Sequence, residues 1–335
     1  MSQSLIAFDT DHIKGYVFGT NKLREIRGAS SLLDSLNREE TEKAAKGFGT
    51  EPLIYANGGS ALFMVDSNEQ QDSTQRAVEL GKEVQRLYRE KTGGGTSISY
   101  AIQLIPAYTG EKDIREVEEL DDGVLMKDVL HLLRVRLRLA KDSLGLPRDA
   151  NMTLPIAQPS YALLCTCESC GVNYAEYLMA DNDNPEGRYC RVCKGKRVED
   201  KKVRDQLDEA KNTPVPEHTL WGRILNELKE VGYDLTDYPQ RPEDFNVFRS
   251  FTHGKEYLGL IYADANSMGI AIANQKSLNE AEKFAALVDG AVFKAVAYAI
   301  NQHLPVQNKT FPFDILMVGG DDIVDAAGKP LFLLD

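Results

Sequence analysis

The chain has 335 residues, 42% of them hydrophobic and 27% charged, a composition typical of an ordinary globular protein. The length excludes a single small module and suggests two or three compact units. The net charge of −12 argues against broad adhesion to nucleic acid, because such binding depends on Lys and Arg contacts with phosphates. This charge favours a small nucleotide held through metal ions instead.

The ends and the hydropathy of the chain exclude two further classes. No run approaches the roughly 18 consecutive apolar residues typical of a membrane span. The N-terminal segment MSQSLIAFDTD has no basic region before its apolar run and resembles a first strand, not a signal peptide. We therefore expect a cytoplasmic protein that makes no contact with a membrane.

Residues 1–108 predict the element order strand, helix, strand, strand, helix, strand, which is βαββαβ. Runs of apolar and β-branched residues favour the strands, and Leu, Ile, Val and Ala at helical spacing favour the helices. The predicted elements are, in order, Ser4–Phe18, Leu23–Leu36, Pro52–Tyr55, Ala61–Val65, Thr74–Lys91 and Ser97–Ile105. Gly58 and Gly59 lie between the two middle strands and tolerate the positive φ of a hairpin turn. One α+β unit is expected here.

The middle of the chain predicts connectors around a cysteine-rich module. Residues 109–159 are expected to form a helical connector that contains a helix at Val124–Ala140. Residues 160–196 hold all the cysteines. Residues 197–255 are densely charged and then punctuated by prolines, so we expect a helical linker with a helix at Leu220–Val231.

Residues 256–335 repeat the pattern of the first part. A strand is predicted at Tyr257–Ile272, a helix at Asn279–Leu304, and a strand, turn and strand at Phe311–Val324. The segment FDTDHIKGYVF corresponds to YADANSMGIAI, and LIYANGGSALFMV corresponds to DILMVGGDDIVDA. The sequence ends 13 residues after Asp322, before a second helix and a fourth strand, so the second unit is expected to be C-terminally incomplete.

Three carboxylates of the second unit have the arrangement that two-metal nucleotidyl transfer requires. Asp264 ends the first predicted strand, and Asp321 and Asp322 lie in the turn of the hairpin beside it. We predict that these catalytic residues bind Mg²⁺ or Mn²⁺. Gly319 and Gly320 leave room for a phosphate or a base near the backbone. The alternative is that the aspartates only favour a tight turn, but the apolar flanks FDILMV and IV and the upstream acid favour the metal site.

The corresponding turn of the first unit is Gly58-Gly59-Ser60, with Ser60 where an aspartate would be needed. This unit is therefore predicted to lack catalytic metals. Asp9 and Asp11 lie toward the same face and, with the turn residues, are candidates for binding a nucleotide. Aspartates near strand ends more often cap the chain or form solvated turns, and this alternative remains open.

The cysteines predict a structural Zn²⁺ site. Cys167-x2-Cys170 and Cys190-x2-Cys193 are separated by 19 residues, which is the spacing of a four-thiolate zinc site. No open coordination position is implied, so the ion would stabilise the fold. Cys165 could replace Cys167 as a ligand, although we prefer Cys167, and free buried cysteines are the weaker alternative.

Other polar residues in the predicted helices have weaker signals. Arg134, Arg136 and Arg138 could contact phosphate, yet alternating arginines along a helix usually form a solvated face. His131 and His303 are assigned no chemistry, because packing is the commoner role for a histidine in a helix.

On these motifs the sequence resembles the large GGDD-containing subunit of type III CRISPR effector complexes, the CRISPR polymerase or cyclic oligoadenylate synthase family. The segment DTDHIKGYVFGTNKLREIRGASSLLDSLN resembles the start of that family's first palm, and YANGGSALF resembles its central hairpin. The cysteine pairs resemble its zinc insert, and IYADANSMG with VGGDD resembles its second palm. The resemblance implies an α+β fold of two ferredoxin-like palm domains with a zinc-knuckle insert.

The resemblance also implies a function. An enzyme of this family joins ATP into cyclic oligoadenylates for antiviral defence, with two ATP molecules bound between the palms. Asn266 and Ser267 would lie close to the nucleotide, and other effector subunits and guide RNA would be partners. No paired His-Asp motif precedes the first palm, so a reduced form without the family's nuclease domain is expected.

Two other functions remain open at this level. An incomplete second palm would suit a catalytically inactive, nucleotide-binding scaffold subunit of an effector complex. A diguanylate-cyclase-like enzyme that uses GTP would share the same palm chemistry. A missing edge strand would also expose a sheet edge, so pairing with another chain, including a second copy, is expected.

Overall fold

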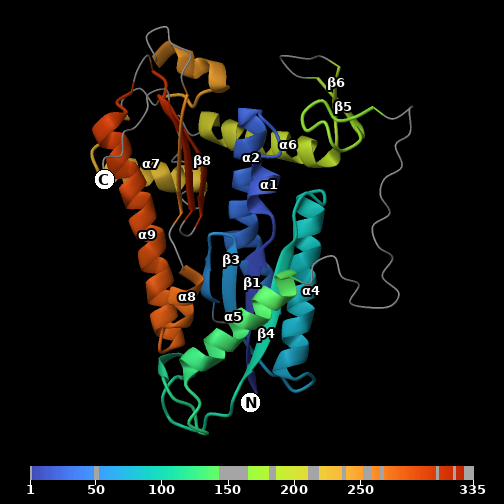
Figure 1. Cartoon of the computed structure of the whole chain (residues 1–335), viewed down its shortest axis with the longest axis vertical. Helices are drawn as coiled ribbons and strands as arrows, with labels where there is room; N and C mark the ends of the chain where they lie inside the picture. The colour runs from blue at the N-terminus through green and yellow to red at the C-terminus, as the bar shows by residue number, and fades with distance from the viewer. Residues whose placement is uncertain are drawn as a thin grey trace.

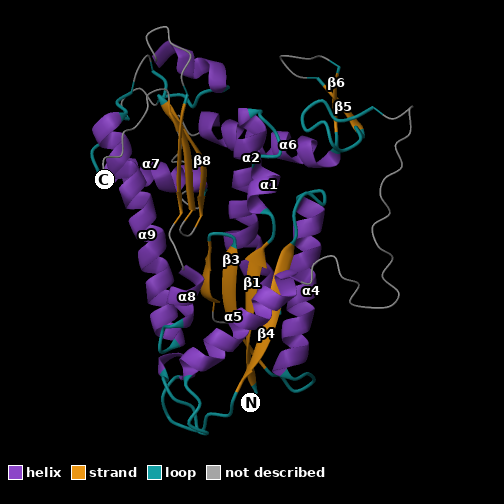
Figure 2. Ribbon diagram, in the orientation of Figure 1, coloured by secondary structure: helices purple, strands orange, loops and turns teal. Residues whose placement is uncertain are grey.

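Two larger antiparallel sheets, of four and three strands, and the helices packed on them form most of the described part of the chain, and a smaller two-stranded sheet accompanies them (Figure 1; Figure 2). The computed structural model describes residues 2–48, 53–142, 165–180, 186–209, 219–235, 239–251, 258–264, 268–306, 309–319 and 322–327. The fold is therefore of the mixed helix-and-sheet class that the sequence predicts. The first sheet and its helices are called the first unit below, and the second sheet and its helices the second unit.

The first sheet has the strand order β2-β3-β1-β4, with every pair antiparallel, which is the order of a βαββαβ unit. Its strands are β1 (Gln3–Thr10), β2 (Leu53–Asn57), β3 (Ser60–Asp66) and β4 (Ile98–Ile105). The helical segments of this unit are α1 (Ile13–Val17), α2 (Leu23–Ser35), the π-helical turn η1 (Leu36–Glu40), α3 (Thr41–Gly47) and α4 (Ser73–Lys91).

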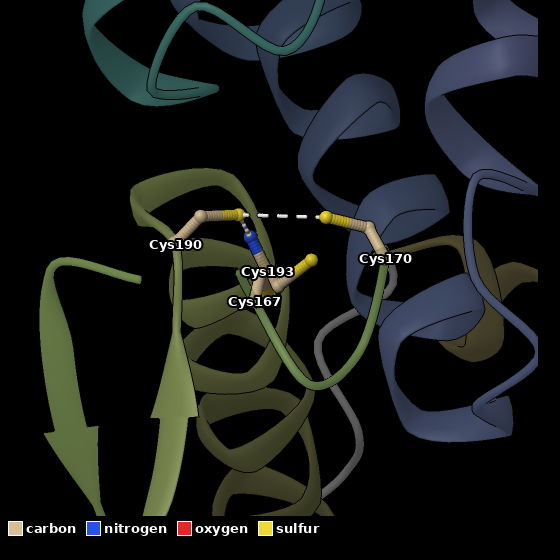
Figure 3. A group of neighbouring side chains, drawn as sticks. All are labelled: Cys167, Cys170, Cys190 and Cys193. Atoms are coloured by element: carbon tan, nitrogen blue, oxygen red, sulfur yellow. Dashed lines mark hydrogen bonds between the residues drawn. The ribbon is translucent and has the colours of Figure 1, made fainter. Parts of the chain in front are cut away.

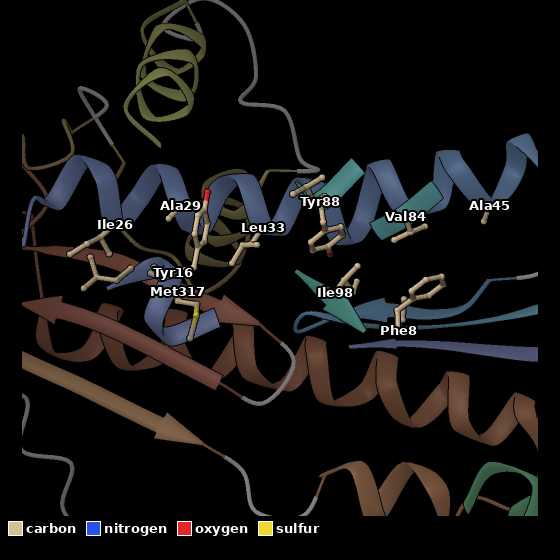
Figure 4. Close-up of a cluster of buried hydrophobic side chains, with 14 of the residues drawn as sticks. Phe8, Tyr16, Ile26, Ala29, Leu33, Ala45, Val84, Tyr88, Ile98 and Met317 are labelled. Atoms are coloured by element: carbon tan, nitrogen blue, oxygen red, sulfur yellow. The ribbon is translucent and has the colours of Figure 1, made fainter. Parts of the chain in front are cut away.

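Both faces of the first sheet are covered, because side chains alternate along a strand. Ile6 and Phe8 point into a core formed with α2 and α4, part of which Figure 4 shows. Leu5 points to the opposite face, where it packs with α5 (Met126–Asp142) and with the beginning of α9 (Leu278–His303). The helix α5 crosses that face diagonally in Figure 1.

The second sheet has the order β7-β9-β8, which matches the order of the first three strands of the first unit, β1-β3-β2. Its strands are β7 (Gly259–Asp264), β8 (Phe313–Gly319) and β9 (Asp322–Ala327). One face packs on α9 and α7 (Leu220–Glu230), and the other sends Met317 into the core of the first unit (Figure 4). No fourth strand pairs with β7 among the described residues.

The cysteine module lies against the first unit. It contains a hairpin of β5 (Tyr177–Met179) and β6 (Gly187–Tyr189), and the helix α6 (Arg191–Glu209), which crosses α2. The 3-10 segment η3 (Phe245–Phe251) follows further along the chain. The crossing needs a glycine, because a Cβ at Gly28 of α2 would lie 1.8 Å from the carbonyl oxygen of Lys196 in α6.

A buried ion network joins the cysteine module to both units. The Arg27 guanidinium of α2 donates to Asp200 of α6 at 2.9 Å and to Asp314 of β8 at 3.1 Å. Arg241 donates to the same Asp314 carboxylate, at 3.1 Å from Nε. All four side chains are largely shielded from solvent. A buried charge left without its partner costs several kcal/mol, so this network ties the three parts together.

Two predicted strands are wrong in length. Ser4–Phe18 was expected as one strand, but β1 ends at Thr10, and the helix α1 follows. Positive φ at His12 turns the chain out of the sheet. The helix α1 then buries Tyr16 and Val17, so the apolar residues that suggested a longer strand are buried by a helix instead. The predicted strand Tyr257–Ile272 likewise ends as β7 at Asp264, and α8 (Met268–Ala273) follows. Each unit therefore begins with a strand and then a short helix.

The helix α9 is the one described helix that is long and apolar enough to cross a membrane by length and composition, with a mean hydropathy of 1.4 over its most apolar window. In this fold α9 packs on α7 through Phe293, Ala297 and Ile300, on β2, and on the 3-10 turn η2 (Ile114–Glu116).

Candidate functional sites

The four predicted cysteine ligands come together. The sulfur atoms of Cys167, Cys170, Cys190 and Cys193 lie within 4.8 Å of one another, and Cys170 Sγ is 4.0 Å from Cys190 Sγ (Figure 3). Four thiolates around one zinc ion at about 2.3 Å would be separated by about 3.8 Å, so the cluster is close to that arrangement. Cys165 is exposed and lies outside the cluster, with its sulfur 3.0 Å from Arg188 Nη1. Cys167, and not Cys165, therefore belongs to the cluster, and its role as a ligand stays a prediction.

Local backbone structure positions these thiols. Cys167 and Cys170 belong to a loop closed by hydrogen bonds from Cys167 N to Asn173 O and from Gly171 N to Cys167 O. Cys190 directly follows β6, and Cys193 lies in the first turn of α6, so the two pairs approach from a loop and from a helix start. Burial raises the pKa of the Cys193 thiol, and the nearby Glu25 carboxylate raises it further. A bound cation would offset both effects, because metal binding deprotonates thiols.

The loop that contains Cys167 and Cys170 contacts α2 through the buried carboxylate of Glu25. Glu25 accepts hydrogen bonds from Ser169 Oγ and from Arg197 Nε, each at 2.6 Å. The Arg197 guanidinium also lies 3.9 Å from the centre of the Tyr189 ring. The four-cysteine cluster therefore holds Ser169 and α6 at the geometry that engages the first unit.

The backbone register of the second sheet brings two of the predicted catalytic positions together. Asp264 at the end of β7 is directly opposite Asp322 at the start of β9, and Gly319 at the end of β8 is opposite the same Asp322. Gly320 and Asp321, between β8 and β9, lie outside the described residues, as do the predicted nucleotide contacts Asn266 and Ser267.

The first sheet has the same register at the same place. Asp9 at the end of β1 is opposite Ser60 at the start of β3, and Asn57 at the end of β2 is opposite Ser60. The turn between them is Gly58-Gly59, with φ of 59° and 82°, a conformation that glycine adopts without strain. By register, Asp9 therefore corresponds to Asp264 and Ser60 to Asp322. The alignment of FDTDHIKGYVF with YADANSMGIAI and that of LIYANGGSALFMV with DILMVGGDDIVDA are each shifted from this correspondence by one residue.

A lysine from α5 lies among the carboxylates of the first unit. Lys141 Nζ is 2.6 Å from Asp9 Oδ2 and 3.9 Å from Asp11 Oδ1. Asp11 is buried, and its other oxygen accepts hydrogen bonds from Ser97 and Ser99 at 3.0 and 3.2 Å. Burial raises the pKa of the Asp9 carboxyl, although Lys141 opposes this effect. The predicted candidates Asp9 and Asp11 are thus brought together around one ammonium group.

A cavity of about 610 Å³ opens beside this lysine. Its walls are the face of the first sheet, α5, α8 and the beginning of α9. The polar and charged lining residues are Asp9, Asn57, Ser60, Arg134, Arg138 and Lys141. The volume falls in the range of small-molecule sites in proteins. Gly58 also lines the cavity, whereas Gly59 does not.

Three residues that line the cavity were not among the candidates predicted from the sequence, namely Lys141, Tyr55 and Asn57. For Lys141 a signal existed, because Arg134, Arg138 and Lys141 have the spacing i, i+4, i+7 and therefore share one helical face. Arg136 lies on another face and donates to the Ile102 carbonyl at 2.9 Å. Arg134 and Arg138 thus border the cavity, although the Arg138 side chain is 78% exposed and lies 3.6 Å from Asp142, whereas Arg136 contacts β4.

Comparisons of the sequence identify no relative: no protein-family model and no curated protein sequence matches it.

Comparison of the structure with solved structures does find similar chains. A chain of a Csm1–Csm4 cassette in complex with pppApA matches with a TM-score of 0.55 and 14% identity over 97% of this chain and 45% of that one. A cassette with one ATP matches with a TM-score of 0.53, at 15% identity over 97% and 46%. The Csm1–Csm4 subcomplex of the type III-A CRISPR-Csm interference complex matches at 0.51, at 13% identity over 97% and 45%. This chain therefore has the fold of a little under half of a chain from these cassettes.

Proposed function

We propose that this chain is a GGDD-type nucleotidyl transferase that converts ATP to a cyclic oligoadenylate, or a related cyclic nucleotide, as a signal in CRISPR-type antiviral defence in the cytoplasm. The observation that carries the proposal is the register that sets Asp264 directly opposite Asp322, beside Gly319. Two aspartates at adjacent strand ends, next to a glycine turn, suit a site for the phosphates of a nucleotide and their metal ions.

The residues at this position fit hard divalent cations. Carboxylate oxygens are the ligands that Mg²⁺ and Mn²⁺ prefer, so Asp264, Asp321 and Asp322 would hold them. When bound, such ions neutralise the phosphates and activate the attacking hydroxyl. Gly319 and Gly320 carry no side chain that would obstruct the approach of a nucleotide, and Asn266 and Ser267 follow Asp264 closely enough to contact it.

The solved structures of the same fold support adenine nucleotides as ligands. The matching cassettes were solved with AMPPNP, pppApA, cA3 and cA4. Each of these cassettes contains Csm1 together with Csm4. We therefore propose a Csm4-like effector subunit as a partner of this chain, and guide RNA as a further partner within the effector complex.

Product formation tests the enzyme proposal. The purified chain is incubated with ATP and Mn²⁺, and the products are separated by chromatography and identified by mass spectrometry. Replacing both acids, Asp321→Ala with Asp322→Ala, should lower the rate by at least about 100-fold, because the metal ions that neutralise the phosphates would lose two of their ligands. The matched control, Asp121→Ala with Asp122→Ala, changes an exposed acidic pair in a different turn and should retain the rate.

The same assay separates the alternatives. GTP in place of ATP should yield little product, and preferential turnover of GTP would favour a diguanylate-cyclase-like enzyme. Absence of any product that depends on Asp321 and Asp322, in the presence of a Csm4-like partner, would contradict the enzyme proposal.

A scaffold subunit without catalysis is the second candidate. It is favoured by the second sheet, in which β7 pairs with β9 on one side and no strand pairs on its other side among the described residues. Nucleotide binding together with assembly into an effector complex, but without product, would support this candidate. An unpaired edge is also a place where another chain can add a strand.

We also propose that the four-cysteine cluster holds one structural Zn²⁺. Four buried or half-buried thiols with sulfurs within 4.8 Å suit a closed tetrahedral site without an open position for substrate. Elemental analysis of the purified chain should therefore find about one zinc per chain. The variant Cys190→Ser should lose this zinc, whereas Cys165→Ser should keep it. Equal zinc content in both variants would contradict the assignment.

A further inference from the structure

A small cavity lies where α2, α6, α7 and β8 meet, next to the buried ion network that joins the two units. Its volume of about 20 Å³ exceeds the about 10–15 Å³ that one water molecule needs. Two arginines and three residues with hydroxyl groups line it, and the described residues that line it include no carboxylate. These polar lining residues are Arg27, Ser30, Ser31, Thr219 and Arg241.

The Arg27 guanidinium has one nitrogen left for an acceptor in this cavity. Its Nε donates to Asp200 at 2.9 Å, and its Nη1 donates to the Pro242 carbonyl at 2.6 Å and to Asp314 at 3.1 Å. Nη2 makes no hydrogen bond among the described residues, although Arg27 is only 4% exposed. A buried donor of a charged group without a partner costs free energy, so Nη2 needs an acceptor.

The N-terminus of α7 contributes further donors to the same cavity. The first N–H groups of a helix have no partner within that helix. In α7 the Thr219 hydroxyl accepts from Gly222 N and the Thr219 carbonyl accepts from Arg223 N, each at 3.0 Å. The N–H groups of Leu220 and Trp221 precede these two, and both residues line the cavity. A helix N-terminus carries partial positive charge and attracts anions.

The ion pairs beside the cavity contain more cations than carboxylates. Asp200 pairs with Arg27 and Arg204, and Asp314 pairs with Arg27 and Arg241. Burial lowers the pKa of the Arg241 guanidinium and the nearby Arg27 lowers it further, although Asp314 opposes both effects. An anion in the cavity would compensate the surplus positive charge.

We propose that this cavity binds one small monovalent anion of the chloride class, held by Arg27 Nη2 and by the first N–H groups of α7. The volume excludes phosphate and other oxyanions of several atoms. A water molecule would fit, but it would leave the surplus positive charge in place. The bound anion joins α2 of the first unit to α7 of the second unit, so it stabilises the contact between them. This inference does not depend on nucleotide chemistry.

Thermal melting of the full chain at constant ionic strength tests the inference. Sodium gluconate is replaced stepwise by sodium chloride or by sodium bromide, so the screening of surface charges stays the same while only the halides fit the cavity. An anion that binds the folded chain alone raises its melting temperature. We expect a rise of at least about 2 °C between gluconate and either halide. Equal melting temperatures in gluconate and chloride would overturn the inference.

Two serines of α2 provide a matched pair of variants. Ser31 lines the cavity, whereas Ser35, one turn later on the same helix, does not, and both are half-buried. Ser31→Val places a larger side chain at the cavity without removing a charge, so it should abolish the dependence of the melting temperature on chloride. Ser35→Val should retain that dependence. An equal dependence on chloride in the two variants would show that the halide acts elsewhere.

Bromide also locates the site directly. Crystals of the full chain grown with sodium bromide should give one anomalous-difference peak within hydrogen-bonding distance of Arg27 Nη2. Density at this place without an anomalous signal would identify a water molecule and contradict the proposal, as would a bromide peak that no halide effect on melting accompanies. Neither measurement involves a nucleotide or a divalent metal ion. Failure of this inference is therefore distinguishable from failure of the proposed function.

Discussion

The two sheets end in the same backbone arrangement but with different charges. In each, the end of the first strand is opposite the start of the third, which brings Asp9 opposite Ser60 in one unit and Asp264 opposite Asp322 in the other. The first unit has lost one carboxylate and gained the ammonium group of Lys141 from α5. One sheet topology can thus present either two facing aspartates, proposed above to bind divalent cations, or an aspartate paired with a lysine.

The largest expected effect is the conversion of one site into the other. Ser60→Asp combined with Lys141→Ala would give the first unit three carboxylates and remove the ammonium group that neutralises them. This variant should bind one more Mn²⁺ per chain than the wild type, because acids held at fixed separation bind divalent ions. Binding is measured by titration with Mn²⁺ followed by electron paramagnetic resonance.

The control for this conversion retains the lysine. Ser60→Asp alone should gain no Mn²⁺, since the ammonium group still occupies the space between Asp9 and Asp11. Equal Mn²⁺ binding with and without Lys141 would break the comparison.

A moderate effect is expected on stability when the lysine alone is lost. Lys141→Met should lower the free energy of unfolding by about 1–3 kcal/mol, because it leaves the buried Asp11 beside a second carboxylate without a cation. The Asp9 share of this loss is small, since its side chain is 35% exposed and water screens it. Urea denaturation measures the change, and a variant as stable as the wild type would show that the pair is dispensable.

The smallest effect concerns pH. Burial raises the pKa of the Asp9 carboxyl above its ordinary value of 3.8, so the folded chain binds this proton more tightly than the unfolded chain does. The contribution of Asp9 to stability is therefore present below pH 3.8 and is lost as pH rises through the pKa of the folded state.

Asp9→Asn removes this loss. Its melting temperature relative to the wild type should therefore rise between pH 3.8 and pH 7, a trend measured by thermal melting across that range. A relative melting temperature that falls with pH would mean that Lys141 outweighs burial at this carboxyl.

The local elements were largely predictable from the sequence, and their ends were not. Helical spacing of apolar residues identified α2, α4, α5, α7 and α9, and the Gly58-Gly59 turn identified the hairpin of β2 and β3. The strand predicted to run to Phe18 was wrong because an apolar run can be buried equally well by a short helix, and positive φ at His12 decides between them. The local pattern of apolar residues does not determine whether such a run forms a strand or a short helix.

The candidate sites divide in the same way. The Cys167, Cys170, Cys190 and Cys193 spacing was sufficient to identify the cluster, because two short knuckles impose a four-ligand geometry by themselves. The pairing of Lys141 with Asp9 could not be assigned from the sequence, since the two residues are 132 positions apart along the chain. The predicted pairing of Asp264 with the hairpin acids agrees with the register at Asp322, whereas Asp321 stays a prediction.

The sequence by itself determined the class of the fold, the internal repeat, the four cysteines that cluster and the acids that mark the second unit. These depend on spacing along the chain, which local sterics and burial convert directly into structure. The tertiary structure alone decided that α5 crosses the first sheet and that the basic residues on one face of this helix line a cavity. It also decided that an ammonium group neutralises the acids of the first unit, because such contacts arise only when distant segments pack together.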